Sequence, residues 1–496
     1  MPHLFSSSRE RFLDNTSLVP LVRSLPLPNP DVYELYSRLT ADSAHPSFLF
    51  ESGKGHATLA RYSFMGYDPY MTISGKGHRH QIWTDGQIVE RTGSAFTAVA
   101  SYLEPSVVMR PSHLPPFIGG AVGLLSYDLV RQFECLPHIA VDDLDLPDVV
   151  FLFVDLVVAV DHSTQTLSLL FTPSPNRFHN EYREQLYREG CERFDEVENR
   201  LSRSNQQAIH VPSLALKGMF SPQQSRAAYT ERVQQCQAYI AAGDIYQANI
   251  SHRFTMDIPD VVEASEQEIG GLLYQRLRQV NPSPFSAFLR LGQMTVVSSS
   301  PERLVRLQGR VAETRPIAGT RPRGSTILED QSLINRLRTN PKERAEHLML
   351  VDLARNDLGR VCRYGSIDVD AFMTVEQYSH VAHLVSNVVG ELHAHVRPSE
   401  LIKAVFPGGT ITGVPKIRCM EIIEELEPVR RGPYTGSIGY WSWSGDIDFN
   451  IVIRTVLLAQ RHGYVQVGAG IVADSQPARE YEETLHKAEA MFQAVG

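Results

Sequence analysis

The chain has 496 residues, 43% hydrophobic and 21% charged, which is typical of a globular protein large enough to bury a substantial core. Its formal net charge of −9 excludes a broad basic surface for nucleic acid, so an anionic ligand would have to meet local cations. The five cysteines lack CxxC spacing and no apolar run could cross a bilayer, which excludes a zinc–thiolate site and predicts a cytoplasmic protein with reduced thiols.

The first part of the chain is rich in strand patterns. Alternating or continuous apolar stretches bounded by turn residues predict strands over 47–52, 59–66, 70–74, 117–127, 148–160 and 166–171, the last two as an antiparallel hairpin. A charged helical stretch over 181–203 then leads into a polar, weakly periodic segment at 205–222, which we interpret as a linker. This divides the chain into an N-terminal region, 1–215, and a second region, 222–494.

The second region begins with clear helix signals. Helical periodicity over 225–242 ends at Gly243, a residue suited to a C-cap, and a second helix is predicted over 266–280. Strands are predicted from 244, over 285–291 and over 295–300, with an arginine-rich loop at 314–324. In the predicted helix 344–358, Glu346 borders an apolar side, and Glu343 could pair with His347 at i,i+4.

The stretch 405–455 combines a glycine-rich turn, a helix and a strand. Pro415 suits the first turn of a helix that runs to about Glu427, and the N–H groups there, together with Lys416, suit an anion. An ordinary loop with a solvated lysine is the alternative. The predicted strand 449–456 is almost entirely apolar but contains Arg454, and a buried guanidinium needs an anion, which is usually a structural carboxylate.

The end of the chain shows a glycine-containing strand and a helix. Two glycines in the predicted strand 464–472 would let a ligand touch the backbone. The last helix, 479–494, separates an apolar side from a charged one that carries Glu483 and Lys487, which could also be a simple i,i+4 surface pair.

Spaced motifs along nearly the whole chain resemble those of one family. They are FLFESG, RYSFMG, SPE, RPIAGTRPRG, RAEHLMLVDLARNDLGR, YSHVAHLVSN, FPGGTITGVPK, GSIGY, NIVIRT, GAGIVADS and EETLHKA. The chain resembles the synthase component I subunits of the chorismate-utilising family. This resemblance implies an α+β fold in which two antiparallel sheets pack together, with helices outside and an active-site cleft between the sheets.

The resemblance also implies a set of site residues. It implies Mg²⁺ held by Glu346 and Glu483, a metal that needs only one or two protein carboxylates. It points to Glu302 and His383 as acid–base candidates for loss of the ring hydroxyl of chorismate. The family's chorismate-contacting positions fall on Gly319, Thr320, Thr410, Tyr434, Arg454, Gly468, Ala469, Gly470 and Lys487.

Two positions bear on the nucleophile and its target. Gln247 stands where members that add water have a lysine base, which implies ammonia, delivered by a separate glutaminase subunit. Ala318 stands where many aminodeoxychorismate synthases have a nucleophilic lysine, and it matches the anthranilate synthases. GDIYQANIS, YTGSIGY and DFNIVIRT look more like the aminodeoxychorismate type, which the sequence therefore favours, with the anthranilate type as the alternative.

A regulatory tryptophan site is the last feature that the resemblance implies. In the anthranilate type this site resembles a serine, here Ser52, together with a Pro-Tyr-Met triplet. The triplet here is Pro284, Phe285 and Ser286, a departure that weakens the case for tryptophan feedback. A catalytically silent binding subunit is a further alternative, but every metal, acid–base and anion position of the family pattern is filled by a competent residue.

Overall fold

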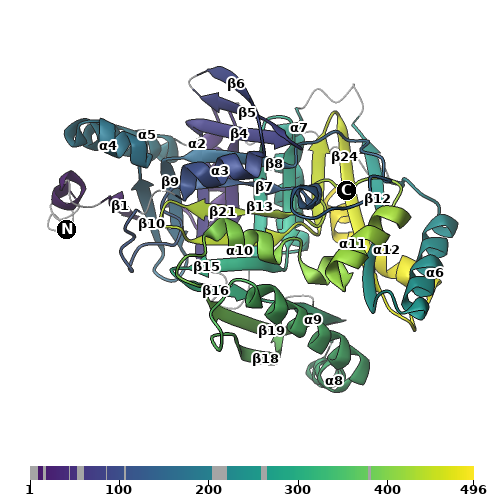
Figure 1. The fold of residues 1–496 in the computed structure, drawn as a ribbon. Helices are drawn as coiled ribbons and strands as arrows, with labels where there is room; N and C mark the ends of the chain where they lie inside the picture. Colours follow the sequence, from purple (N-terminus) through teal and green to yellow (C-terminus); the bar gives the residue numbers. More distant parts are fainter. Residues whose placement is uncertain are drawn as a thin grey trace.

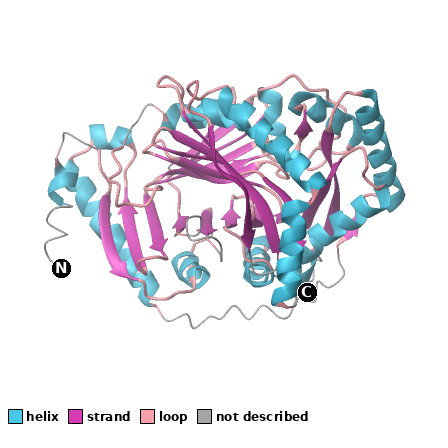
Figure 2. Ribbon diagram, turned by 90° about the horizontal axis from the view of Figure 1, so that it is seen from below, coloured by secondary structure: helices cyan, strands magenta, loops and turns pink. Residues whose placement is uncertain are grey.

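The computed structural model describes residues 9–14, 18–43, 45–52, 61–84, 86–104, 108–203, 220–258, 265–324, 326–377 and 381–495, without the side chains of Asn180, Thr320, Pro322 and Val381. Most of the predicted linker therefore lies outside the described residues. Strands occupy the middle of the molecule and helices lie along its periphery, as Figure 2 shows. The predicted α+β class with two antiparallel sheets and outer helices is confirmed.

Two 12-stranded sheets account for the strands of the described part of the chain. In order across the first sheet, these are β1 (Leu21–Pro26), β10 (Thr166–Phe171), β9 (Leu156–Asp161), β3 (Tyr62–Tyr67), β2 (Ser47–Glu51), β13 (Phe285–Arg290), β14 (Thr295–Ser300), β23 (Thr455–Ala459), β24 (His462–Ile471), β12 (Gln247–Asp257) and β11 (Ser221–Pro222), with β20 (Gly413–Val414) beside β12. The register of β12 on β24 runs from Ala248 opposite Ile471 to Asp257 opposite His462.

The second sheet contains the other twelve strands. In order they are β17 (Ile317–Pro322), β19 (Val381–Glu391), β16 (Val311–Thr314), β15 (Arg303–Gln308), β22 (Ile447–Ile451), β21 (Ser437–Ser442), β7 (Gly120–Leu125), β8 (Val149–Val154), β4 (Met71–Lys76), β5 (Arg79–Thr84) and β6 (Gln87–Thr92), with β18 (Asp368–Gln377) beside β19. Each sheet takes strands from both predicted regions of the chain, and the division into regions stays a prediction.

Besides a short helix over residues 9–13, eleven α-helices of the described chain lie outside the sheets (Figure 2). They are α2 (Val32–Thr40), α3 (Ala95–Leu103), α4 (Pro175–Asn180), α5 (Arg183–Ser202), α6 (Arg226–Ala242), α7 (Glu266–Val280), α8 (Ile327–Thr339), α9 (Pro341–Gly359), α10 (Pro398–Val405), α11 (Lys416–Leu426) and α12 (Pro477–Val495), with short 3₁₀ helices at Tyr127–Gln132 and Gly409–Ile411. Figure 1 shows α6, α11 and α12 beside β12 and β24, and α8 and α9 beside β18 and β19.

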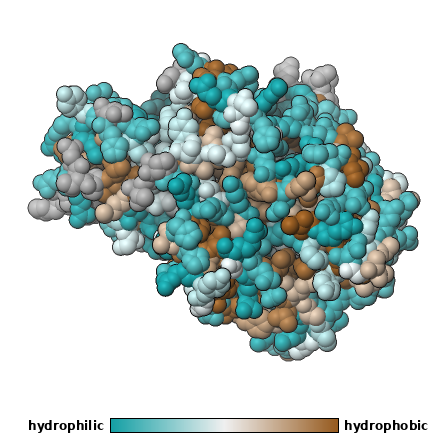
Figure 3. Space-filling model, in the orientation of Figure 1, coloured by the Kyte–Doolittle hydropathy of each residue, from teal (hydrophilic) through white to brown (hydrophobic). Residues whose placement is uncertain are grey.

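Alternation along the strands divides the apolar side chains between two main cores. On β2, Phe48 faces the core between the two sheets, whereas Leu49 faces the core between the first sheet and helices such as α7 and α12. Phe117 and Tyr440 stack in the inter-sheet core with ring centroids 4.8 Å apart. The face in Figure 3 is mostly hydrophilic, with apolar side chains in small separate patches. None of the described helices is long and apolar enough to span a bilayer.

Four of the sequence predictions are wrong, three of them because pairing in the sheets overrides local pattern. The predicted strand 148–160 is two strands in different sheets, β8 and β9, and the predicted strand 449–456 likewise divides into β22 and β23. The predicted loop 314–324 contains β17, which pairs with β19 despite its proline and glycine residues. The predicted i,i+4 pair is also absent, since Glu343 pairs with Arg321 at 2.6 Å and His347 contacts Ser386.

Candidate active site

The acid–base candidate Glu302 lies where the chain passes from β14 in the first sheet to β15 in the second. It is only 6% exposed. Its Oε1 accepts a hydrogen bond from Thr410 Oγ1 at 2.8 Å. Burial raises the pKa of Glu302 to about 7, although hydrogen bonds from Thr410 and the Ile317 backbone and the charges of Arg454 and Lys487 act in the opposite direction. A carboxyl group with this pKa can donate a proton near neutral pH.

Arg454 lies at a second passage between the sheets, from β22 to β23. Its backbone has a positive φ of 51°, which breaks the expected continuous strand. Burial lowers the pKa of this guanidinium, and Glu302 opposes that shift. No carboxylate among the described residues lies within ion-pair distance of Arg454. The expectation of a structural carboxylate partner is therefore not met, and the guanidinium is available to an anionic ligand.

His383 and the two predicted loop residues Ala318 and Gly319 lie on the paired strands β19 and β17. The His383 ring is 2% exposed, and burial and Arg454 lower its pKa to about 3, while a hydrogen bond with the Gly319 backbone opposes that shift. The imidazole is therefore neutral at physiological pH. Gly319 has φ +70°, and a Cβ there would lie 2.3 Å from Glu343 Oε2, so the bulge requires glycine. Thr320 lies in β17.

The glycines of β24 bring backbone close to polar side chains. A Cβ on Gly468 would lie 2.9 Å from Tyr434 Oη, and one on Gly470 would lie 2.5 Å from Gln247 Nε2. Ala469 lies between them, opposite Ile250. Burial raises the pKa of Tyr434 to about 12, so its hydroxyl stays a neutral hydrogen-bonding group.

Lys487 and Gln247 connect this strand to two carboxylates. Lys487 Nζ donates to the Gly468 carbonyl at 3.0 Å and pairs with Glu483 at 2.9 Å on α12. Gln247 Nε2 donates to Glu346 Oε1 of α9 at 3.1 Å. The two predicted metal ligands, Glu346 and Glu483, therefore face the same part of the site from helices that pack on different sheets.

Four carboxylates on α9 and α12 act on one another in pairs through their charges. The pKa of Glu346 is raised by burial and by the charges of Glu343 and Glu483, and that of Glu480 is raised by burial and by Glu483. Sequence analysis did not assign Glu343 or Glu480 to the site, although their i,i+3 spacing from the predicted ligands is a readable signal. In the described chain no three such side chains converge into a ready metal cage. The set fits Mg²⁺, which keeps several waters and takes one or two carboxylates.

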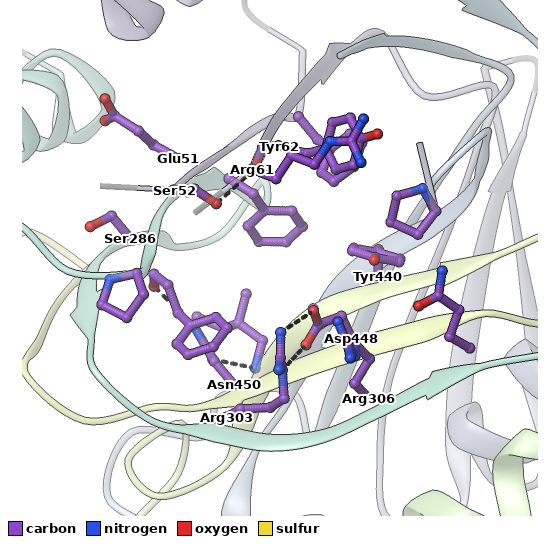
Figure 4. Close-up of a pocket in the computed structure, with 18 of the residues that line it drawn as sticks. Glu51, Ser52, Arg61, Tyr62, Ser286, Arg303, Arg306, Tyr440, Asp448 and Asn450 are labelled. Atoms are coloured by element: carbon purple, nitrogen blue, oxygen red, sulfur yellow. Dashed lines mark hydrogen bonds and ion pairs between the residues drawn. The ribbon is translucent and has the colours of Figure 1, made fainter. Parts of the chain in front are cut away.

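A separate cavity of about 280 Å³ brings together the residues of the predicted tryptophan site. Figure 4 shows Ser52 and Ser286 near each other, because β13 pairs with β2 and Ser286 lies opposite Glu51, while Arg303 and Asp448 form an ion pair at another part of the lining. Pro284 and Phe285 also line this cavity. Ser52 Oγ donates to the Tyr62 carbonyl at 2.7 Å. Binding of an amino acid there stays a prediction.

Comparison with known proteins gives consistent matches. Residues 45–493 match the family described as chorismate binding enzyme. The chain is 40% identical to aminodeoxychorismate synthase component 1 of Bacillus subtilis (96% of this chain, 97% of the relative) and 37% identical to anthranilate synthase component 1 of Geobacillus stearothermophilus (96% and 94%). The crystal structure of anthranilate synthase component I from Streptococcus pneumoniae has a TM-score of 0.74 and 32% identity, covering 87% of this chain and 92% of that one.

Proposed function

Because the chain belongs to the family of chorismate binding enzymes, we propose that it aminates chorismate with ammonia to give 4-amino-4-deoxychorismate, as an aminodeoxychorismate synthase component I. The observation that carries amination is Gln247. Its amide is held by Glu346 and faces Gly470, and it offers no basic group that could activate water. Ammonia is itself a nucleophile and needs no such base. A separate glutaminase subunit would supply it.

The charges of the site suit a dianionic substrate. Arg454, which has no carboxylate partner among the described residues, would bind one carboxylate of chorismate in bidentate fashion. The other carboxylate would be held near Glu346 and Glu483, where Mg²⁺ would supply positive charge. Tyr434 and the backbone of Gly468 would contact the substrate between these two points.

Loss of the ring hydroxyl needs a proton donor, and Glu302 is the group whose pKa suits that role. Its carboxyl, with a pKa near 7, would protonate the leaving hydroxyl, which departs as water. The neutral His383 ring would orient the substrate by hydrogen bonding rather than by charge. The proton released by the attacking ammonia balances the one that the hydroxyl takes up.

Anthranilate synthesis is the alternative, and Ala318 is the observation that favours it. Ala318 lies on β17 opposite Leu384, next to His383, and is 6% exposed. An alanine cannot form the covalent adduct that a lysine would provide. If amination occurs at C4, the position of the ring against Ala318 must direct it.

A product assay separates the two. Purified chain is incubated with chorismate, Mg²⁺ and excess ammonium at mildly alkaline pH, with and without an aminodeoxychorismate lyase, and the products are resolved by chromatography. A yield of 4-aminobenzoate that depends on the lyase supports the proposal. Anthranilate and pyruvate formed without the lyase would establish the alternative. Absence of any aminated product, in the presence of ammonium and also with a glutaminase subunit, would refute both.

A further inference from the structure

Asp357 and Lys416 form a buried ion pair that the proposed chemistry does not use. Lys416 Nζ lies 2.7 Å from Asp357 Oδ2 and donates to the Val405 carbonyl at 3.2 Å. The two side chains are 13% and 12% exposed, so the pair keeps a narrow contact with solvent. This pairing explains why Lys416 is neither the anion site nor the solvated lysine that the sequence suggested. Asp357 lies in the last turns of α9, whose earlier turns carry Glu346.

A small cavity joins this ion pair to the acid of the active site. The cavity measures about 30 Å³, and both Glu302 and Asp357 line it, together with Thr410 and Ala354. One water molecule needs roughly 10–15 Å³ of such accessible space, so this cavity can hold about two water molecules. The carboxylates and the Thr410 hydroxyl supply the polar partners that buried water requires. Glu302 thus borders a space on the α9 side that also reaches Asp357.

We propose that this cavity holds a short water chain through which Glu302 exchanges protons with Asp357. The inference rests on the proposed function, in which Glu302 gives its proton to the leaving hydroxyl and becomes a carboxylate. A cavity water then donates a proton to Glu302 and takes one from Asp357, and Asp357 takes one from solvent beside Lys416. Every proton is replaced, and no other reactant is needed. Asp357 acts through Glu302 and touches no substrate.

The charges around the two carboxyls support exchange between them. Burial raises the pKa of both groups, so each carboxyl holds a proton more readily than an exposed carboxyl does. Arg454 and Lys487 face Glu302 and oppose its shift, while Lys416 and Arg360 do so for Asp357. Arg303 also lines the cavity, but its guanidinium is occupied by Asp448 and Glu313.

Two kinds of variant test this exchange of protons between Asp357 and Glu302 through the cavity water, which we call the relay. Asp357→Asn, combined with Lys416→Met so that no lone charge stays buried, removes the relay group, whereas Ala354→Leu fills the cavity and leaves every charge in place. Asp352→Asn, on the exposed side of α9, is the matched control. The measurements are kcat and KM for chorismate against pH with saturating ammonium and Mg²⁺, and the solvent deuterium isotope effect on kcat.

For both relay variants we expect kcat to fall by about tenfold above neutral pH, which is below the 10²–10⁴ that a general acid itself contributes, because only its reprotonation is slowed. KM should change little, the solvent isotope effect should rise, and the control should match the wild type. Unchanged pH profiles and isotope effects in folded Ala354→Leu protein would overturn the relay, even if the double variant failed to fold. A wild-type enzyme that forms no aminated product would instead refute the proposed function.

Discussion

Replacing Glu302 by glutamine should stabilise the protein at alkaline pH while it removes activity. Burial raises the Glu302 pKa from 4.5 to about 7, so between these values the folded state binds a proton that the unfolded state has released. The free energy of unfolding therefore falls as pH rises from about 4.5, and the loss is complete above about 7. At ~1.36 kcal/mol per pKa unit, it amounts to about 3 kcal/mol.

Glutamine has the volume of the neutral acid and offers a similar donor and acceptor, so Glu302→Gln should avoid this loss. We expect a gain of about 2–3 kcal/mol over the wild type at about pH 8 and less than 1 kcal/mol at about pH 5. Urea unfolding of both proteins at about pH 8 and about pH 5 measures these differences in the free energy of unfolding, with Glu489→Gln on the exposed side of α12 as control. An equal gain at both pH values, or a loss at the higher one, would refute the assignment of a buried, reluctantly ionised carboxyl. Turnover should fall by roughly 10²–10⁴.

Other substitutions probe the rest of the site. Gly468→Ala places a Cβ 2.9 Å from both Tyr434 Oη and the Ile250 backbone carbonyl oxygen, so steady-state kinetics should show a raised KM for chorismate and urea unfolding a loss of stability of about 1–3 kcal/mol. Arg431→Met leaves the buried Glu427 without its partner at 2.7 Å and should cost about 3–5 kcal/mol in urea unfolding, much of which a second Glu427→Met change should restore. Glu346→Gln should weaken Mg²⁺ binding to the substrate-free chain in calorimetry, and an unchanged affinity would contradict its role as a ligand.

The helices were predictable because their ends carry local signals. Ser225 caps α6 by accepting from the Ala228 N–H, and Gly243 ends that helix with a φ of 85°, as its sequence indicates. The α7 prediction over 266–280 coincides with the helix for a similar reason, a capping box at Ser265. The helix α8 was missed because its exposed, charged sequence shows little periodicity.

The strands were predictable in type but not in partner. Apolar, β-branched stretches identify buried strands, yet the same pattern continues where the chain leaves one sheet for the other, as it does around Asp155 and Arg454. The carboxylates predicted as metal ligands show a similar limit. Glu346 and Glu483 were predicted through resemblance alone, since their meeting depends on how α9 and α12 pack across the cleft. No local sequence signal in either helix indicates that Glu346 and Glu483 come close together.

These passages between sheets also explain where the candidate active site lies. Within a strand, side chains alternate between the two faces of the sheet, whereas a residue where the chain passes between sheets lies outside that alternation. Glu302 and Arg454 occupy two neighbouring passages, tied together where the Ile451 N–H donates to the Glu302 carbonyl at 3.0 Å and the Ser299 N–H donates to the Arg454 carbonyl at 3.1 Å. The two sheets thus hold an acid and a cation close together inside the molecule. Burial then gives Glu302 its high pKa and leaves Arg454 in need of the anion that the substrate would bring.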